Sequence, residues 1–324
     1  MKAIVFTEYG DPKNLEFLDV PDPSPQEDEV LVRVHASSIN SWDWEYLTGT
    51  PFANRLMFGL FKPRRSKQRL GADIAGVVEA VGAKATRFRP GDAVFGDLWE
   101  AWGGFAELAC IPETSLEPIP ANLSFAQAAA VPQAGVLALS GYRKHPGLGP
   151  GNKVLINGAG GGVGMFAIQL AKLDGIEVTG VDAGHKLDAM RSFGADHVID
   201  FAQEDFTGTG VTYDLIIDCQ YSRPWSRCRR ALTPTGRYAV IGGQVPRIMR
   251  AMLGGQVGKL FGRTSALQVV MDGPNKDLDH LCELLEAGKL VSHLDSSFML
   301  EQVPQALQYF GEGHHKGKIA ITVV

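Results

Sequence analysis

A glycine-rich stretch, residues 159–164, constrains the fold of this chain more than any other feature. It reads Ala-Gly-Gly-Gly-Val-Gly, follows a short apolar run at 153–157 and precedes a run of helical periodicity at 165–172. A second apolar run, 177–181, then ends in Asp182. This order predicts a βαβ unit whose first turn binds a dinucleotide. Glycines let the backbone approach a pyrophosphate, and the helix N-terminus offers N–H groups and partial positive charge.

The length and net charge of the chain limit the kinds of protein that it can be. A length of 324 residues predicts about two domains, and the net charge of −5 gives no reason to expect nucleic-acid binding. No apolar run has the length of a membrane span. Glu8 and Asp11 interrupt the apolar N-terminus too early for a secretory signal, so we expect a cytoplasmic protein. The four cysteines are scattered, which favours ordinary buried thiols; they are Cys110, Cys219, Cys228 and Cys282.

The pattern of apolar runs changes along the chain. Up to about residue 120, β-branched runs are separated by Pro, Gly and Asp, which predicts a β-rich, barrel-like domain. From 121 to 268 strands and helices alternate, which predicts a doubly wound parallel sheet; its expected strands are 153–157, 177–181, 197–200, 214–218 and 237–241. The tail adds a helix at 278–285 and a strand at 319–324. The expected fold class is therefore α/β.

Several motifs together resemble the medium-chain dehydrogenase/reductase superfamily, in its zinc-free quinone oxidoreductase-like branch. The residues that carry the resemblance are 36–40, 71–82, 90–92, 103–107, 157–164 and 193–200. The resemblance covers nearly the whole chain and implies a GroES-like catalytic domain (1–120 and 269–324) with a Rossmann NAD(P)-binding domain (121–268). It also implies hydride transfer from NAD(P)H to a quinone or another activated double bond, and a homodimer.

The residues argue against zinc. Zinc-dependent relatives place a Cys after the first long strand and Gly-His-Glu after the next loop, where this chain has 38–43 and Gly71-Ala72-Asp73. Neither stretch offers the thiolate or imidazole that zinc prefers. The four-Cys lobe of such relatives is also absent from the sequence. We therefore expect no metal.

Three catalytic candidates follow from the resemblance. Asn40 would lie in the catalytic cleft, where its amide would donate to the oxygen of an enolate as negative charge develops there. Asp43 stands at the acidic position of the family. Relatives with a phenolic proton donor have Tyr where this chain has Glu45, and Tyr46 is the neighbouring candidate; water is the alternative donor.

The resemblance also assigns the cofactor contacts. The phosphate turn consists of Ala159, Gly161, Gly162, Val163 and Gly164, and the nicotinamide side is expected near Asp218, Gly242 and Gly243. Asp182 would accept from the ribose 2′-hydroxyl and repel a 2′-phosphate, which favours NADH. His185 and Lys186 would instead favour NADPH, so both cofactors stay open. Leu137 stands where relatives often carry a Thr that faces the nicotinamide.

Two apolar segments carry an excess of cations. Residues 51–70 contain six basic residues and no acid, and residues 244–268 contain four basic residues and no acid. They are either solvated helices, a lid over an apolar substrate site, or a weak membrane-surface contact. We expect the two segments to flank the mouth of the cleft, with Phe58 and Leu253 among the apolar residues.

The sequence bears on three other functions. A short-chain reductase needs a Tyr-xxx-Lys pair after the fourth strand, but that spacing occurs here at Tyr9 and Lys13, at the opposite end. An alcohol dehydrogenase-type enzyme and a non-enzymatic NADPH-binding relative both stay as alternatives.

Overall fold

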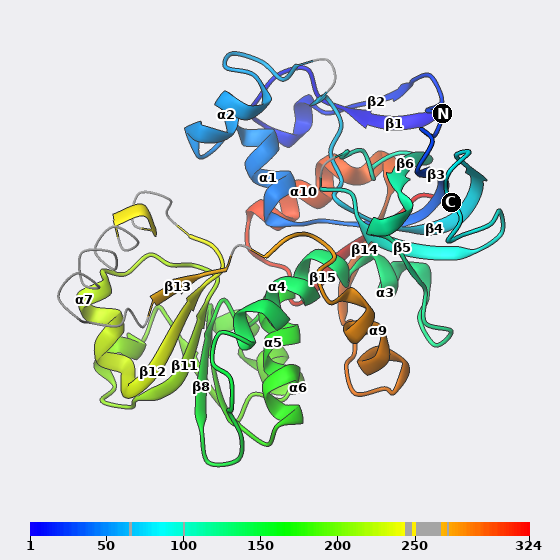
Figure 1. The fold of residues 1–324 in the computed structure, drawn as a ribbon. Coiled ribbons are helices and arrows are strands. Elements are labelled where there is room, and N and C mark those ends of the chain that lie inside the picture. The colour runs from blue at the N-terminus through cyan, green and yellow to red at the C-terminus, as the bar shows by residue number, and fades with distance from the viewer. Residues whose placement is uncertain (65–66, 100, 244–247, 251–266, 271) are drawn as a thin grey trace. The chain divides into compact units, whose positions relative to one another are not determined.

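The computed structural model describes residues 1–64, 67–99, 101–243, 248–250, 267–270 and 272–324. The chain forms two compact units (Figure 1). The first consists of Met1–Val136, Pro274–Gly288 and Ser292–Val324, and the second of Leu137–Gly273 and Lys289–Val291.

The first unit is built on a seven-stranded, mostly antiparallel sheet, which gives the GroES-like domain its β-rich character. Its strand order is β14 (Leu294–Met299), β15 (Lys318–Thr322), β3 (Glu29–Ser38), β4 (Asp73–Val81), β5 (Ala93–Asp97) and β7 (Glu117–Pro118), with β6 (Leu108–Pro112) also paired to β3. Valines at alternate positions of β3 face a buried core: Val30, Val32 and Val34. A separate antiparallel pair joins β1 (Lys2–Val5) and β2 (Glu16–Asp19).

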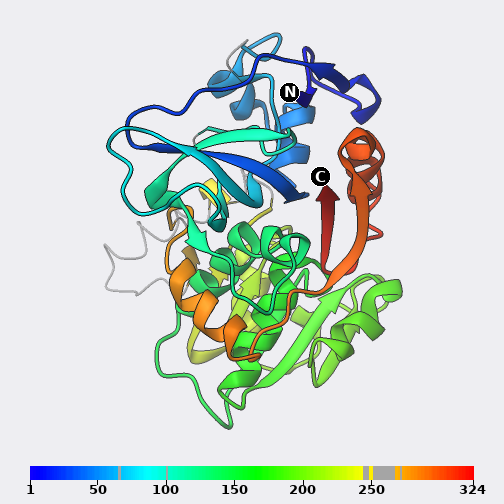
Figure 2. The ribbon, with the colours of Figure 1, turned by 90° about the vertical axis from the view of Figure 1, so that its right-hand side faces the viewer.

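The first unit also contains several helices. They are α1 (Ser41–Thr48), α2 (Phe52–Phe58), α3 (Phe125–Ala129), α9 (Leu278–Glu286) and α10 (Val303–Gly311), with short 3-10 turns η1 (Pro12–Asn14), η3 (Glu113–Ser115) and η7 (Leu300–Gln302). Helix α10 lies beside β14 and β15 (Figure 2). Its apolar residues Val303, Ala306 and Leu307 recur at helical spacing and pack into a core with Tyr46 and Leu47 of α1.

The second unit is a doubly wound Rossmann-type sheet. All six strands are parallel, in the order β10 (His197–Asp200), β9 (Glu177–Asp182), β8 (Lys153–Asn157), β11 (Tyr213–Asp218), β12 (Leu232–Val240) and β13 (Leu267–Val269). Helices α5 (Gly162–Leu173) and α6 (Leu187–Ser192) lie on one side of the sheet and α7 (Trp225–Cys228) on the other (Figure 1); η4 (Gly184–Lys186), η5 (Phe206–Gly208) and η6 (Arg229–Ala231) complete the connections. The strand order reverses at β8, and sheets of this kind bind ligands beyond the carboxyl ends of the strands at such a reversal.

The borders of the two units differ from the expected 120/121 and 268/269. Helix α4 (Pro132–Tyr142) contains the first border, after Val136. Residues up to Val136 stay with the first unit, where the Gln133 N–H donates to Asp73 at 3.2 Å. Strand β13 pairs with β12, which keeps the chain in the second unit through Gly273.

None of the helices within the described ranges has both the length and the apolar character to cross a membrane. The cysteines are free, with Cys228 buried and the other three half-buried. The prediction of buried thiols therefore holds for Cys228, and burial raises the pKa of all four thiols.

Candidate active site

Asn40 and Asp43 meet at the turn from β3 into α1. Asn40 is the N-cap of α1, and Asp43, at the third helical position, accepts the Asn40 N–H at 2.9 Å through Oδ2. The other oxygen of Asp43 accepts the Gly71 N–H at 2.9 Å. A carboxylate that reaches back to the N-cap in this way fixes the start of a helix. The structure thus brings these two predicted residues together, and Asp43 orients the backbone around Asn40.

Asp73, the first residue of β4, binds the side chain of Asn40. Its Oδ2 accepts from Asn40 Nδ2 at 2.9 Å and from Ser38 Oγ at 3.0 Å. Its Oδ1 accepts the Gln133 N–H at 3.2 Å. Ser38 and Asp73 are direct partners in the β3–β4 ladder, so the register of the sheet sets this contact.

Lys318 binds the oxygen of the Asn40 side chain, whereas Asp73 binds its nitrogen. It is the first residue of β15, where Ala320 pairs with Ser38 and the Ile39 N–H donates to the Ile319 carbonyl at 3.0 Å. Its ammonium donates to Asn40 Oδ1 and, at 3.1 Å, to the Ile39 carbonyl. The residue is 3% exposed. Sequence analysis missed Lys318 because every residue of the strand after it is apolar or small, so no alternation marks the lysine as inward-facing.

Three buried carboxyl groups surround this ammonium. Asp97 is the direct partner of Asp73 in the β4–β5 ladder. Burial is the main cause that raises the pKa of Asp43 to about 7, and burial also raises the pKa of Asp73 and that of Asp97. Burial lowers the pKa of Lys318, while the aspartates oppose that effect. These carboxyl groups are harder to ionise than exposed ones, because burial and neighbouring like charges both oppose ionisation.

Tyr46 lies in an aromatic core instead of beside Asn40. Its ring is stacked on Trp102 with centroids 4.6 Å apart and packs against Phe58 at 3.6 Å and Phe6 at 5.6 Å. The side chain is fully buried, and its hydroxyl has no hydrogen-bond partner among the described residues. Burial raises the pKa of this phenol well above its usual range. Its role as a proton donor stays a prediction, and these surroundings favour a packing role.

The predicted phosphate turn has the shape that a dinucleotide needs. It links β8 to α5, and the first helical hydrogen bond runs from the Met165 N–H to the Gly161 carbonyl at 2.9 Å. The helix therefore does not use the N–H groups of Gly162, Val163 and Gly164. A Cβ on Gly164 would lie 2.4 Å from the Cα of Ala159, so glycine is required where the helix meets the turn. These residues fit a pyrophosphate.

Asp182 binds the backbone of this turn and also pairs with Lys186. Asp182 ends β9, and its two carboxylate oxygens accept the Gly160 N–H at 2.9 Å and the Ala183 N–H at 2.8 Å. Lys186 Nζ lies 3.8 Å from Asp182 Oδ1, and both side chains are largely buried, at 7% and 12% exposure respectively. His185, between them in sequence, is exposed. Lys186 therefore partly compensates the charge of Asp182, which sequence analysis treated as an isolated acid.

Asp218, Gly242 and Gly243 organise the carboxyl ends of β11 and β12. Asp218 is 1% exposed and accepts from Tyr238 Oη at 2.5 Å and from Asn157 Nδ2 at 2.7 Å. The Tyr221 N–H donates to the Gly242 carbonyl at 3.1 Å, and Gly243 has a φ of 127° beside the same residue; its Cβ would lie 2.5 Å from Tyr221 N. Asp218 is thus a positioning residue for these loops.

The residues at the expected zinc position do not fit a zinc ion. Asn40 and Asp73 come from the two stretches where zinc-dependent relatives carry ligands, and both contact the ammonium of Lys318. A fixed cation in their midst opposes a second one. Across the described ranges, no three His, Cys, Asp or Glu side chains are grouped so that they could hold a metal.

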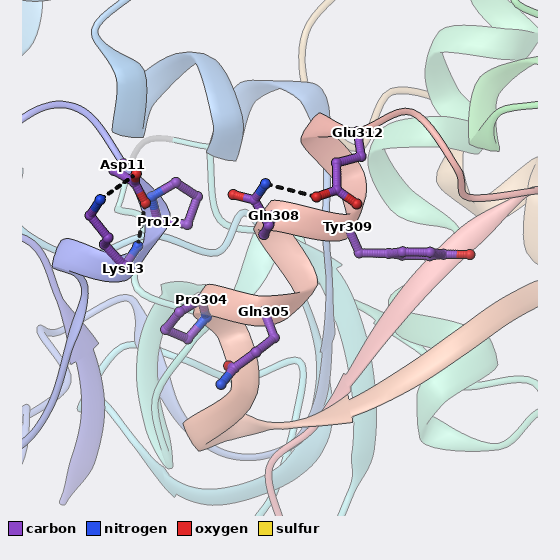
Figure 3. A pocket seen from close by; sticks show the side chains of 8 residues that line it. All are labelled: Asp11, Pro12, Lys13, Pro304, Gln305, Gln308, Tyr309 and Glu312. Atoms are coloured by element: carbon purple, nitrogen blue, oxygen red, sulfur yellow. Dashed lines mark hydrogen bonds and ion pairs between the residues drawn. The ribbon is translucent and has the colours of Figure 1, made fainter.

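A groove of about 520 Å³ lies elsewhere on the first unit, between η1 and α10 (Figure 3). Gln308 donates to Glu312 at 2.9 Å and Lys13 pairs with Asp11 at 3.1 Å along its wall. None of the predicted site residues lines it, so the groove is not part of the candidate site.

Comparisons with known proteins match both the N-terminal and the C-terminal part of the chain to dehydrogenase families. Residues 26–121 match the family model of the alcohol dehydrogenase GroES-like domain, and residues 193–321 match the model described as zinc-binding dehydrogenase. Among curated relatives, the chloroplastic quinone-oxidoreductase QR1 of Triphysaria versicolor is 33% identical over 99% of this chain and 98% of its own. The 2-methylene-furan-3-one reductase of Solanum lycopersicum is 31% identical over 99% of this chain and 79% of its own.

Solved structures agree with this placement. The quinone oxidoreductase of Coxiella burnetii has a TM-score of 0.86 and 29% identity, with coverage of 100% of this chain and 99% of that one. The predicted GroES-like and Rossmann architecture is confirmed.

Proposed function

Because the chain belongs to the medium-chain dehydrogenase/reductase superfamily, in its quinone oxidoreductase-like branch, we propose that it reduces a quinone or an α,β-unsaturated carbonyl with NAD(P)H. Relatives of up to 33% identity carry names of this kind, a quinone oxidoreductase and a furanone reductase. The observation that carries the proposal is a glycine turn shaped for a dinucleotide in one unit and a buried, oriented Asn40 amide in the other.

The cofactor supplies a hydride when it is bound. For conjugate reduction, hydride adds to the β-carbon, the electron pair of the C=C bond shifts, and negative charge develops on the carbonyl oxygen. The part of this chain is to stabilise that charge. Asp73 accepts one hydrogen of Asn40 Nδ2 at 2.9 Å, and the second hydrogen of the amide is the donor that we assign to the substrate oxygen. A proton from solvent or a side chain then completes the product.

We further propose that NADPH binds at least as well as NADH. Lys186 partly compensates the charge of Asp182, and two backbone N–H groups bind its carboxylate, so its repulsion of a 2′-phosphate is weaker than the sequence alone suggests. Fluorescence titration of both reduced cofactors tests this. Lys186→Ala should weaken NADPH at least tenfold and NADH little, with Lys84→Ala as an exposed control. Equal losses for the two cofactors would contradict the assignment.

The activity itself is tested with a panel of quinones, enones and simple alcohols. We expect oxidation of NAD(P)H with quinones or enones, and Asn40→Ala should lower kcat about 100-fold while cofactor binding is kept. Asn14→Ala is the matched control. Brisk oxidation of a simple alcohol would favour the alcohol dehydrogenase alternative. Tight NADPH binding with no turnover on any substrate would favour the non-enzymatic alternative.

The apolar segment at 51–70 is proposed to contact bulky substrates or a membrane surface. Its described part exposes Phe52, Leu56, Leu60 and Phe61, the last at 88%. Phe58 is instead buried against Tyr46, which corrects its expected place in a lid. Of the second segment, 244–268, residues 244–247 and 251–266, including Leu253, lie outside the described residues. A homodimer and a cytoplasmic location also stay predictions, and light scattering tests the first.

A further inference from the structure

A buried ammonium occupies the centre of the catalytic unit. Lys318 is 3% exposed, and its Nζ faces three oxygen atoms from the ends of two strands. The oxygens belong to Ile39 and Asn40, which follow β3, and to Asp73, which begins β4. Taking a lysine out of water is unfavourable, so an arrangement that keeps one here needs a compensating function or a compensating charge.

Charge compensation for Asp73 accounts for only part of the geometry. Lys318 Nζ and Asp73 Oδ2 form a buried ion pair at 3.6 Å, a distance too long for a hydrogen bond. The carboxylate takes its hydrogen bonds from Ser38, Asn40 and the Gln133 N–H instead. The hydrogen bonds of the ammonium go to two neutral oxygens, the Ile39 carbonyl and Asn40 Oδ1. Lys318 therefore gives its hydrogen bonds to the side-chain amide of Asn40 and to the peptide link between Ile39 and Asn40.

We propose that Lys318 is the positioning residue of the reductase site: its ammonium holds and polarises the Asn40 amide where zinc-dependent relatives would hold a metal ion. This inference rests on the proposed function. Lys318 fixes Oδ1 and Asp73 fixes Nδ2, so the amide has one orientation. A cation on the carbonyl oxygen of an amide makes its N–H groups stronger donors. The same cation also favours negative charge on an oxygen bound at Nδ2.

The arrangement explains how a metal-free site would stabilise an oxyanion. Both stretches that would carry zinc ligands, 38–43 and 71–73, contribute oxygens that contact Lys318. Lys318 lies on β15, and the antiparallel pairing of β15 with β3 brings its ammonium beside Asn40.

The test compares Lys318→Met with the double variant Lys318→Met/Asp73→Asn. The single variant leaves a buried carboxyl group without its cation, whereas the double variant removes both charges. We expect Lys318→Met to lower kcat for an enone or quinone about 30-fold, with KM and the dissociation constant of NADPH changed less than threefold. Asp73→Asn alone is measured beside the double variant, because Asp73 also holds Asn40 Nδ2. The double variant should regain thermal stability but have a kcat well below that of Asp73→Asn. A purely structural lysine predicts that the double variant regains stability and matches the kcat of Asp73→Asn, which would overturn the proposal.

A binding assay separates this proposal from the proposed function. Para-nitrophenol resembles an enolate when ionised, and its phenolate form absorbs visible light. In the presence of NADP⁺, wild-type protein should bind the phenolate form and lower the pKa of the bound phenol by about one unit, a tenfold gain in ionised fraction. Lys318→Met should abolish that gain. Wild-type protein that turns over no enone but shows the gain would refute only the reductase activity. Absence of the gain in wild type, or its persistence in Lys318→Met, would refute the role of Lys318.

Discussion

The buried carboxyl group of Asp43 makes the stability of this protein depend on pH in an unusual direction. Burial raises its pKa from the ordinary value of 3.8 to about 7. Between these values the folded state holds a proton that the unfolded state has lost, so the free energy of unfolding falls as pH rises. A shift of this size corresponds to a loss of up to about 4 kcal/mol between pH 4 and pH 8, reached once Asp43 ionises.

The perturbation is Asp43→Asn, which cannot ionise. Its amide can accept only one of the two backbone N–H groups, from Asn40 and Gly71, that the carboxylate accepts. At pH 4 the folded wild type holds a neutral carboxyl group whose hydroxyl oxygen is the weaker acceptor, so the loss there is at the lower end of about 1–3 kcal/mol. Wild type should therefore be the more stable protein at pH 4. The difference should shrink by up to about 4 kcal/mol towards pH 8 and reverse its sign.

Urea unfolding at several pH values, followed by tryptophan fluorescence, measures this difference. The tryptophans report mainly on the first unit, since Trp42, Trp44, Trp99 and Trp102 belong to it and only Trp225 to the second. Taking the difference between the two proteins cancels groups that titrate alike in both. Asp28→Asn, at an exposed position, is the matched control and should give a flat difference. A flat or rising difference for Asp43→Asn would refute the argument.

Three further predictions use other parts of the structure. Tyr46→Phe should raise stability by about 1 kcal/mol, because the buried hydroxyl has no partner among the described residues, and should keep kcat; a loss of 100-fold would reinstate the phenol as proton donor. Protein purified without an affinity tag should contain well below one zinc per chain by elemental analysis, and stoichiometric zinc lost together with activity to a chelator would contradict this. Phe61→Ser should reduce efficiency more for long-chain than for short-chain quinones, or weaken binding to anionic vesicles; equal effects on all substrates, with no vesicle binding in wild type, would leave Phe61 as an ordinary exposed residue.

Local patterns in the sequence were enough to predict most of the second unit. The strands expected at 153–157 and 197–200 are β8 and β10, and the strand expected at 177–181 is β9 with Asp182 added. Each βα step is short and carries its own signals, namely an apolar strand, a glycine turn and a periodic helix. The start of α1 was not predicted, although Asn40 and Asp43 stand three residues apart as a capping pair does.

The chemistry of the site depended on tertiary structure. Lys318 and Asn40 are 278 residues apart in the chain, and only the pairing of β15 with β3 brings them together. The pairing of Lys186 with Asp182 depends on how η4 turns after β9, which weakens the charge argument made from Asp182 alone. By itself, the sequence determined the superfamily and the cofactor turn, because their signals are local. The register between distant strands decided which charges share one buried volume, because register is set by packing across the whole sheet.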